Sequence, residues 1–273
     1  MTAAREFLVP FQWTGELQMP LADFMDEAKR VAEEAKTRGL VVRVMGAVAF
    51  GIHCPEFISL HRKLGRDFSD LDFVSYNRQQ DGVLKLFADI GYSTDRRRQY
   101  IAQIAGRGQR TMLDDPQNGR RIDIFFDQLE MCFVIDFKKR LELDFPTISL
   151  ADLLLEKMQI VKLTEKDIKD TIVLLREHNV GKAGPETIDS EYIAELGAKD
   201  WGLYYTMTTN LQKVLEGMES YEALQDKDKE DLKAKVSSLR DTIERKDKSM
   251  QWKMRARIGT KRKWYRDVAE VSD

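Results

Sequence analysis

The chain has 273 residues, of which 42% are hydrophobic and 33% are charged, and its formal net charge is −2. This balance is typical of a globular protein with a sizeable core, and the length suits one large or two modest domains. A net charge this close to zero argues against bulk electrostatic binding to nucleic acid, although a local basic surface stays open. No apolar run approaches the roughly 20 residues that cross a bilayer, and the N-terminus lacks the pattern of a signal peptide. We therefore expect a cytoplasmic protein without membrane association.

The two cysteines, Cys54 and Cys132, have no CxxC spacing, which favours buried thiols in a reduced compartment. The three histidines lack the spacing of zinc ligands. Ordinary surface or core imidazoles are the simplest interpretation. Because His53 and His61 lie just upstream of the acidic motif described below, contact with a substrate is the alternative for these two.

The first half of the chain predicts alternating helices and strands. Apolar residues recur at helical spacing in residues 21–38, and a short run rich in β-branched residues at 40–45 predicts a buried strand. An Asp-Pro-Gln-Asn-Gly turn at 115–119 predicts a hairpin. The remaining expected elements are helices at 47–53 and 81–90 and strands at 70–76, 111–113, 121–126 and 131–137. Together they predict a mixed β-sheet with helices packed on it.

The character of the sequence changes after Pro146. Ser149 is placed to cap a helix over 150–163, and no strand pattern returns. Further helices are expected at 166–177, from 191, at 201–216 and at 221–258. We predict an α+β protein with a mixed-sheet domain flanked by helices at 1–148, followed by an all-helical C-terminal domain at 149–273 that ends in a basic tail.

The most informative stretch, residues 66–73, reads Arg-Asp-Phe-Ser-Asp-Leu-Asp-Phe. In an extended strand Asp70 and Asp72 project from one face, while Leu71 and Phe73 point into the protein. Two like charges held side by side are costly unless a cation neutralises them, and paired carboxylates beside substrate phosphates are typical ligands of Mg²⁺. The stretch therefore favours phosphoryl or nucleotidyl transfer. A pair of acids on a solvated strand end is the simpler alternative.

A glycine turn precedes this strand. Val-Met-Gly-Ala at 44–47 predicts a strand that ends at Gly46 and a helix that follows it. Glycine lets the backbone approach a ligand, and the free N–H groups of a helix N-terminus bind phosphate. We expect the backbone N–H groups of Gly46 and Ala47 to contact a triphosphate, although many such turns carry a glycine for purely local reasons.

A third acid lies within the apolar strand at 121–126. Burying the charge of Asp123 without a partner would cost several kcal/mol. Either Arg121 or another neighbour pairs with it, or Asp123 completes a three-carboxylate metal site with Asp70 and Asp72. Asp127, toward the end of the same strand face, is the second choice for this role.

This order of glycine turn, acidic pair and third acid resembles the nucleotidyltransferase fold superfamily, the polymerase-β-like enzymes. The likeness extends to Leu-Ala-Asp-Leu-Leu-Leu-Glu-Lys-Met-Gln at 150–159 and Lys-Asp-Ile-Lys-Asp at 166–170. These segments look like the AbiEii-type branch of bacterial toxin–antitoxin and abortive-infection systems. That branch has an Arg-x-Ser-x-Asp-Leu-Asp-Phe motif, a helix with a glutamate–lysine pair and an Arg-Asp-x-x-Asp motif. The resemblance covers roughly residues 40 to 175.

The resemblance implies an enzyme that transfers a nucleoside monophosphate from a nucleoside triphosphate to a hydroxyl of RNA (tRNA included), a protein or a small molecule. It implies Mg²⁺, or Mn²⁺ in its place, held by Asp70, Asp72 and Asp123, which are also the catalytic residues. It implies a cognate antitoxin as a partner. The nucleotide-binding residues that it implies lie around these acids: Gly46, Ala47, Ser69, Lys157 and Asp167.

The chain also departs from the family pattern. Ala47 stands where glycine or serine is usual, Ser69 is one residue closer to the first metal aspartate, and Lys166 replaces an arginine. These departures motivate two alternatives, a catalytically degenerate nucleotide- or RNA-binding module and a structural half of a toxin–antitoxin pair. For Lys157 the alternative is an ordinary helix lysine that keeps its charge in water. For Lys166 and Asp167 it is a solvated helix start.

Basic residues form two clusters. The first surrounds the third acid strand and either neutralises phosphates or forms a solvated hairpin face: Arg96, Arg97, Arg98, Arg107, Arg110, Arg120 and Arg121. The second is the basic tail at 246–266, in which Trp252, Trp264 and Tyr265 are interleaved. These aromatic residues either stack on single-stranded nucleic acid or dock the tail onto the rest of the protein.

Overall fold

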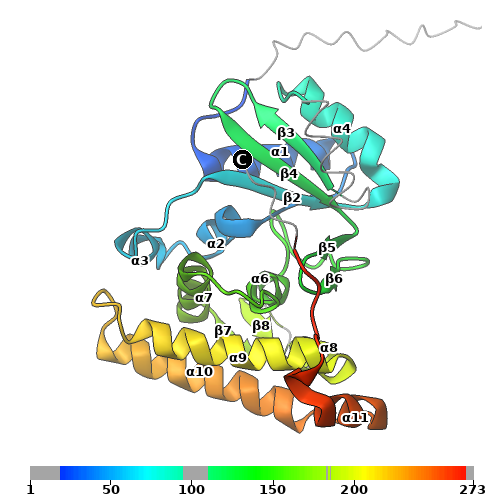
Figure 1. Cartoon of the computed structure of the whole chain (residues 1–273). Helices are drawn as coiled ribbons and strands as arrows, with labels where there is room; N and C mark the ends of the chain where they lie inside the picture. The colour runs from blue at the N-terminus through cyan, green and yellow to red at the C-terminus, as the bar shows by residue number, and fades with distance from the viewer. Residues whose placement is uncertain (1–18, 95–109, 183, 185, 269–273) are drawn as a thin grey trace, which may run out of the picture.

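A four-stranded mixed sheet forms the part of the molecule that carries the acidic motif (Figure 1). The computed structural model describes residues 19–94, 110–182, 184 and 186–268. The strands lie in the order β1-β2-β4-β3; β2 and β4 are parallel, and the two outer pairings are antiparallel. Their bounds are Val42–Met45 for β1, Asp70–Ser75 for β2, Arg110–Asp115 for β3 and Arg120–Phe126 for β4. The expected mixed sheet is confirmed.

Among the described residues, four helices accompany this sheet. They are α1 (Phe24–Thr37), α2 (Gly46–His53), α3 (Ile58–Lys63) and α4 (Gln80–Asp89), the last preceded by a 3₁₀ turn, η1 (Asn77–Gln79). Helix α1 begins three residues later than the apolar spacing predicts, because the carboxylate of Asp23 accepts hydrogen bonds from the N–H groups of Met25 and Asp26 and caps the helix there.

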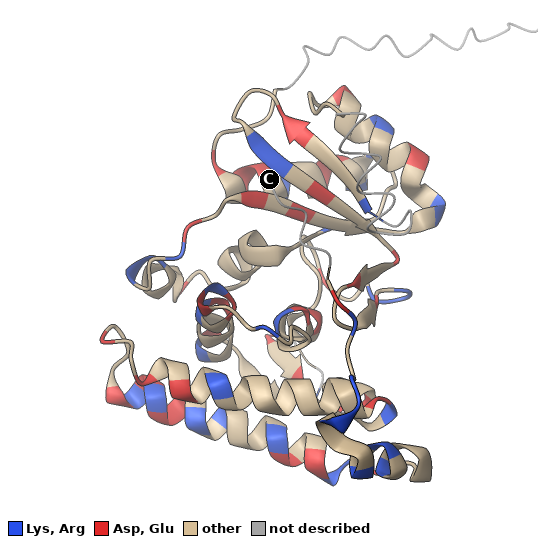
Figure 2. Cartoon of the chain, viewed as in Figure 1, with Lys and Arg blue, Asp and Glu red and all other residues tan. Residues whose placement is uncertain are grey.

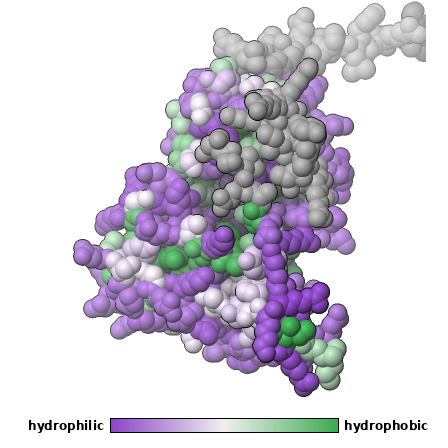
Figure 3. Space-filling view, in the orientation of Figure 1, coloured by the Kyte–Doolittle hydropathy of each residue, from purple (hydrophilic) through white to green (hydrophobic). Residues whose placement is uncertain are grey.

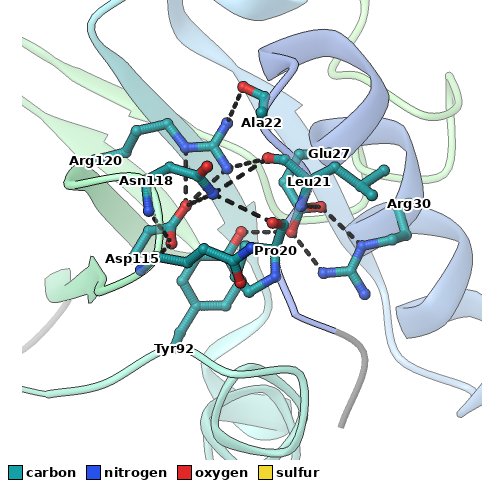
Figure 4. A network of polar contacts seen from close by, with 10 residues as sticks. Pro20, Leu21, Ala22, Glu27, Arg30, Tyr92, Asp115, Asn118 and Arg120 are labelled. Carbon is teal, nitrogen blue, oxygen red and sulfur yellow. Dashed lines mark hydrogen bonds and ion pairs between the residues drawn. The ribbon is translucent and has the colours of Figure 1, made fainter. Parts of the chain in front are cut away.

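A buried polar network joins the turn between β3 and β4 to the start of α1 (Figure 4). The guanidinium of Arg120 donates a hydrogen bond of 2.7 Å to Asp115 and another to the carbonyl oxygen of Leu21. Glu27 accepts hydrogen bonds from the Tyr92 hydroxyl and the Leu21 N–H. Arg120 is therefore a buried structural residue and does not belong to a surface that neutralises phosphates.

The second half of the chain is mainly helical. A small hairpin of β5 (Gln128–Glu130) and β6 (Val134–Asp136) precedes it, so the strand expected at 131–137 is shorter than predicted. Helices α9 and α10 lie side by side at the base of Figure 1. None of the helices formed by the described residues has both the length and the apolar character that a membrane span requires. The bounds are α6 (Leu150–Met158), α7 (Glu165–Glu177), α8 (Ser190–Lys199), α9 (Trp201–Met218), α10 (Asp226–Arg245), α11 (Met250–Ile258) and a 3₁₀ turn, η2 (Gly259–Lys261).

The prediction of an all-helical C-terminal region is wrong. Strands β7 (Asn179–Gly181) and β8 (Thr187–Asp189) pair in parallel, with Val180 opposite Ile188. Each strand has three residues, which is too short for the alternation of apolar and polar residues that identifies a strand in a sequence.

Two expected helices are also shorter than predicted. Helix α6 ends at Met158 because the side-chain amide of Asn210 donates hydrogen bonds to the carbonyl oxygens of Met158 and Ile160. The helix expected at 221–258 is interrupted between α10 and α11. There the Lys248 ammonium donates to the last carbonyl groups of α10, and Ser249 caps α11.

The apolar core continues across the expected domain boundary. Phe73 of β2 and Leu155 of α6 are completely buried and belong to one cluster of buried apolar side chains. The backbone next to the boundary pairs with β1, since the Val44 N–H donates to Pro146 and the Ile148 N–H donates to Val44, each at 3.0 Å. The division of the chain at residue 148 stays a prediction.

Candidate active site

The sheet register brings the second and third acids together. Asp72 of β2 lies directly opposite Asp123 in the parallel strand β4. Leu71 and Phe73 are completely buried on the other face of β2, as the alternation of the motif predicts. Adjacent strands lie about 4.8 Å apart, so the two carboxylates are neighbours. Figure 2 shows the acidic residues of β2 and β4 on the central strands of the sheet.

Asp72 carries most of the electrostatic strain of this arrangement. No described residue donates a hydrogen bond to its carboxylate or forms an ion pair with it. Burial raises the pKa of Asp72 well above its usual value, and the negative charges of Asp70, Asp123 and Glu156 raise it further. A cation bound between these carboxylates would relieve the repulsion.

Asp123 already has a cationic partner. The guanidinium of Arg110, on β3, donates to both carboxylate oxygens of Asp123 at 2.9 and 2.8 Å. The sequence left open whether Asp123 pairs with Arg121 or another neighbour, or completes a metal site. The structure shows a pair, and its partner is Arg110, not Arg121. Asp127 lies outside this group, because its positive φ of 60° ends the strand and its carboxylate accepts a hydrogen bond from the Asn77 N–H.

The glycine turn is fitted against Asp72. Gly46 has φ +66°, a backbone conformation that favours glycine. A Cβ atom at this position would also lie 2.1 Å from an Asp72 carboxylate oxygen. Both the conformation and the close contact therefore require glycine. The Gly46 N–H donates to the Glu156 carboxylate at 3.1 Å. It is therefore held by the protein, which differs from the expectation that it faces a triphosphate. Ala47 is buried in the first turn of α2, whose N-cap residue, Met45, makes no side-chain cap.

Lys157 lies in the middle of a buried charge cluster. Its ammonium is 3.2 Å from Asp170, 3.5 Å from Asp167 and 3.7 Å from Glu156. Burial acts to lower the pKa of Lys157, but these three acids outweigh it and raise the pKa above its usual value. The interpretation of Lys157 as a lysine with its charge in water is wrong; its side chain is buried and its charge is neutralised by acids.

Asp170 connects this cluster to the acidic motif, a role that the sequence did not predict. Its completely buried carboxylate accepts hydrogen bonds from Arg66 at 2.9 Å and pairs with His61 at 2.8 Å. Arg66 belongs to the same motif as Asp70. The signal in the sequence was the spacing: Asp167 and Asp170 are three residues apart on one face of α7.

Two further predicted residues have local partners. Asp167 forms a capping box with Thr164 at the start of α7, so it serves as a helix cap as well as a neighbour of Lys157. The Ser69 hydroxyl donates to Asp70 at 3.1 Å. Lys166 is exposed at the start of α7, as its alternative interpretation held.

A cleft of about 570 Å³ gathers most of the predicted site residues. Its lining includes Asp70, Asp72, Asp123, Lys157 and Asp167, together with Arg110 and Glu156. An adjoining cavity of about 500 Å³ shares part of this wall and adds the remaining predicted residues: Gly46, Ala47 and Ser69. The structure thus brings all eight predicted residues to one place, and volumes of this order accommodate small-molecule ligands.

The C-terminal strap, which we define as residues 264–268, runs from the basal helices toward the sheet (Figure 1). The indole N–H of Trp264 donates to Thr206 at 3.1 Å, and the Arg266 N–H donates to the Cys132 carbonyl at 3.0 Å. Arg266 also pairs with Glu130, and residues 266–268 line the cleft. Figure 3 shows hydrophilic residues along the described part of the chain before residue 269, beside a band of apolar residues on this face.

The aromatic residues of the basic tail dock it onto the helices, which was one of the two interpretations. Trp264 packs edge-on against Tyr205 with ring centroids 5.3 Å apart, and the Trp252 indole N–H donates to Gly197 at 2.9 Å. These contacts hold both indole rings against the helices. In the first basic cluster, Arg110 and Arg120 pair with acids, whereas Arg96, Arg97, Arg98 and Arg107 lie outside the described residues.

A scan of the sequence against protein-family models finds no match, and a search of curated proteins finds none either.

Proposed function

We propose that this chain is a Mg²⁺-dependent nucleotidyltransferase, which transfers a nucleoside monophosphate from a nucleoside triphosphate to an acceptor hydroxyl. The observation that supports this most is the convergence of Asp70, Asp72 and Asp123 on one cleft, with no described residue pairing with Asp72. Clustered carboxylate oxygens of this kind fit a hard divalent cation, and Mn²⁺ takes the same ligands. The residues present therefore suit the metal that the motif resemblance implies.

Bound Mg²⁺ would neutralise the triphosphate and make its α-phosphorus a better electrophile. The chain's own residues would supply positioning and proton transfer. Arg110 first releases the Asp123 carboxylate and turns to a phosphate oxygen. Asp123 then accepts the proton of the acceptor hydroxyl. The Gly46 N–H stays with Glu156, so the first turn of α2 would face the phosphates with the backbone N–H groups from Ala47 onward, and pyrophosphate leaves in line with the attacking oxygen.

Transfer activity of Asp72→Asn tests this proposal. The assay incubates purified protein with Mg²⁺, each α-labelled nucleoside triphosphate in turn and a mixture of total RNA and protein as acceptors. We expect the wild type and the matched control Asp127→Asn to label an acceptor. We expect Asp72→Asn to lose at least about 100-fold in rate. Labelling by Asp72→Asn at the wild-type rate would contradict the proposal.

A non-catalytic nucleotide- or RNA-binding module is the second candidate. Two contacts within the protein favour it, because each engages a group that catalysis would use. Arg110 pairs with Asp123, and Glu156 accepts the hydrogen bond of the Gly46 N–H. Such a module would bind a nucleotide with Mg²⁺ and transfer nothing. The labelling assay and a binding titration with the same protein sample separate the two candidates.

The acceptor and any antitoxin partner rest on the motif resemblance alone. Gel filtration of the chain with and without the product of a neighbouring gene tests the partner. Co-elution at a defined stoichiometry supports a toxin–antitoxin pair, and independent elution of the two proteins contradicts it.

A further inference from the structure

Two of the three histidines of this chain are far apart in the sequence but adjacent in the fold. They lie outside the acidic cleft. His53 is the last residue of α2, and His178 follows the last residue of α7. Their rings lie edge to face with centroids 5.8 Å apart. Glu186, between β7 and β8, brings its carboxylate to within 3.1 Å of His178 Nδ1. One ligand atom from each of these residues lies within 4.8 Å of the other two.

The hydrogen bonds of His178 identify the atom that faces this cluster. Its Nε2 lies 3.1 Å from the carbonyl oxygen of His53. Nε2 also lies 4.0 Å from the Cys54 sulfur. In the tautomer that donates Nε2–H to this carbonyl oxygen, Nδ1 carries the lone pair. His178 is 2% exposed, and its Nδ1 is buried with no hydrogen-bond partner among the described residues.

The Nδ1 atom of His178 and a carboxylate oxygen of Glu186 lie 3.1 Å apart, and no hydrogen bond joins them. Both atoms have a lone pair to offer a metal ion, and one ion bound between them would satisfy both.

His53 completes a set of ligands suited to a transition metal. Its Nε2 is hydrogen-bonded with the Thr147 hydroxyl and lies 3.5 Å from the carboxylate of Asp144, which adds a second acidic group at this end of α2. Imidazole nitrogen and carboxylate oxygen together are typical of Zn²⁺ sites, whereas Mg²⁺ prefers oxygen alone. The ligand chemistry therefore differs from that of the three aspartates in the cleft.

We propose that His53, His178 and Glu186 form a second metal site, which takes Zn²⁺ or a divalent transition-metal ion of similar preference. The ion would join the C-terminal end of α2 to the end of α7 and to the segment before β8. Helix α2 begins at Gly46, which abuts Asp72, so the ion would brace the helix that shapes one wall of the cleft. This inference does not depend on the proposed transfer activity.

Zn²⁺ titration of the metal-free full-length chain tests this site, with excess Mg²⁺ present to occupy the acidic cleft. A chromophoric chelator reports free Zn²⁺. Glu186 is exposed, so Glu186→Gln should fold, and Glu222→Gln is a matched control in the turn before α10. Loss of an outer-shell partner alone weakens metal sites by about 10- to 100-fold. We expect one Zn²⁺ per chain in the wild type and in Glu222→Gln, and binding weaker by about 100-fold in Glu186→Gln.

Co²⁺ provides a second readout, because cobalt in a low-symmetry nitrogen and oxygen site absorbs visible light. We expect the wild type to show these bands and His178→Gln to lose them. Asp72→Asn should bind Zn²⁺ as the wild type does, which separates this site from the proposed active site. The inference is overturned if the wild type takes up no Zn²⁺, if Glu186→Gln binds as tightly as Glu222→Gln, or if Asp72→Asn abolishes uptake.

Discussion

Replacing Asp72 with asparagine should stabilise the metal-free protein while removing its activity. The Asp72 carboxylate lies opposite Asp123, and no described residue donates a hydrogen bond to it. Two like charges about 4.8 Å apart repel by about 3.5 kcal/mol at an effective dielectric constant of about 20. Arg110 already neutralises much of the Asp123 charge, and Lys157 acts in the same direction on Asp72. A net gain of about 1–2 kcal/mol remains for the variant.

In a chain of this size, each kcal/mol corresponds to about 2–4 °C in the melting temperature. We therefore expect Asp72→Asn to melt about 2–8 °C above the wild type without divalent metal. Circular dichroism at pH 7 measures this, with Asp127→Asn as the control that should leave the melting temperature unchanged. Excess Mg²⁺ should raise the melting temperature of the wild type more than that of the variant. A metal-free Asp72→Asn that melts below the wild type would refute the reasoning, because it would show that the Asp72 charge is stabilised in the folded protein.

Three further predictions concern the surroundings of the cleft. Gly46→Ala should lose about 2–4 kcal/mol in urea unfolding, whereas Gly39→Ala, with φ +71° and open space around its Cβ, should lose only the backbone cost of about 1–2 kcal/mol. Asp170→Asn should lose about 3–5 kcal/mol, because it leaves Lys157 buried with fewer acids. Burial acts to raise the pKa of Asp170, but the hydrogen bonds and charges of its neighbours outweigh it and lower the pKa. Its stabilisation is therefore present at neutral pH and is lost as the pH falls below about 4. The free energy of unfolding of the variant should therefore fall less steeply in this acid range than that of the wild type. Trp264→Ala should release the C-terminal strap, and trypsin should cleave within the strap faster than in the wild type.

Each of these has a contrary outcome. Equal losses for the two glycine variants would mean that the contact with the aspartate carboxylate is relieved by a small shift. If the free energy of unfolding of Asp170→Asn falls as steeply with acid as that of the wild type, other carboxylates dominate acid unfolding. Equal trypsin cleavage would mean that the remaining contacts of residues 265–268 hold the strap.

Local patterns were sufficient for the strand that carries the aspartate pair and for the turn that precedes α2. The alternation in the motif predicted that Asp70 and Asp72 share one face of β2, and the glycine turn predicted that α2 starts at the end of β1. Both follow from the backbone geometry of a few consecutive residues. The same reasoning missed β7 and β8, since three-residue strands depend on their partner for stability and leave no periodic pattern.

Partners across the fold could not be read in this way. That Arg110 pairs with Asp123 depends on the register of β3 against β4, and that register is set by the turn and by packing. The buried cluster around Lys157 required knowledge of how α7 lies against α6. The meeting of His53, His178 and Glu186 depends on three separate elements, so the spacing of the histidines in the sequence gave no sign of it.

The most direct test of the central claim is a calorimetric titration of each nucleoside triphosphate, with Mg²⁺, into the wild type and Asp70→Asn. It requires no knowledge of the acceptor. The account predicts that the wild type binds at least one nucleotide in a Mg²⁺-dependent manner and that Asp70→Asn does not. Failure of the wild type to bind any of them, or equal binding by Asp70→Asn, would contradict a nucleotide site built on these aspartates.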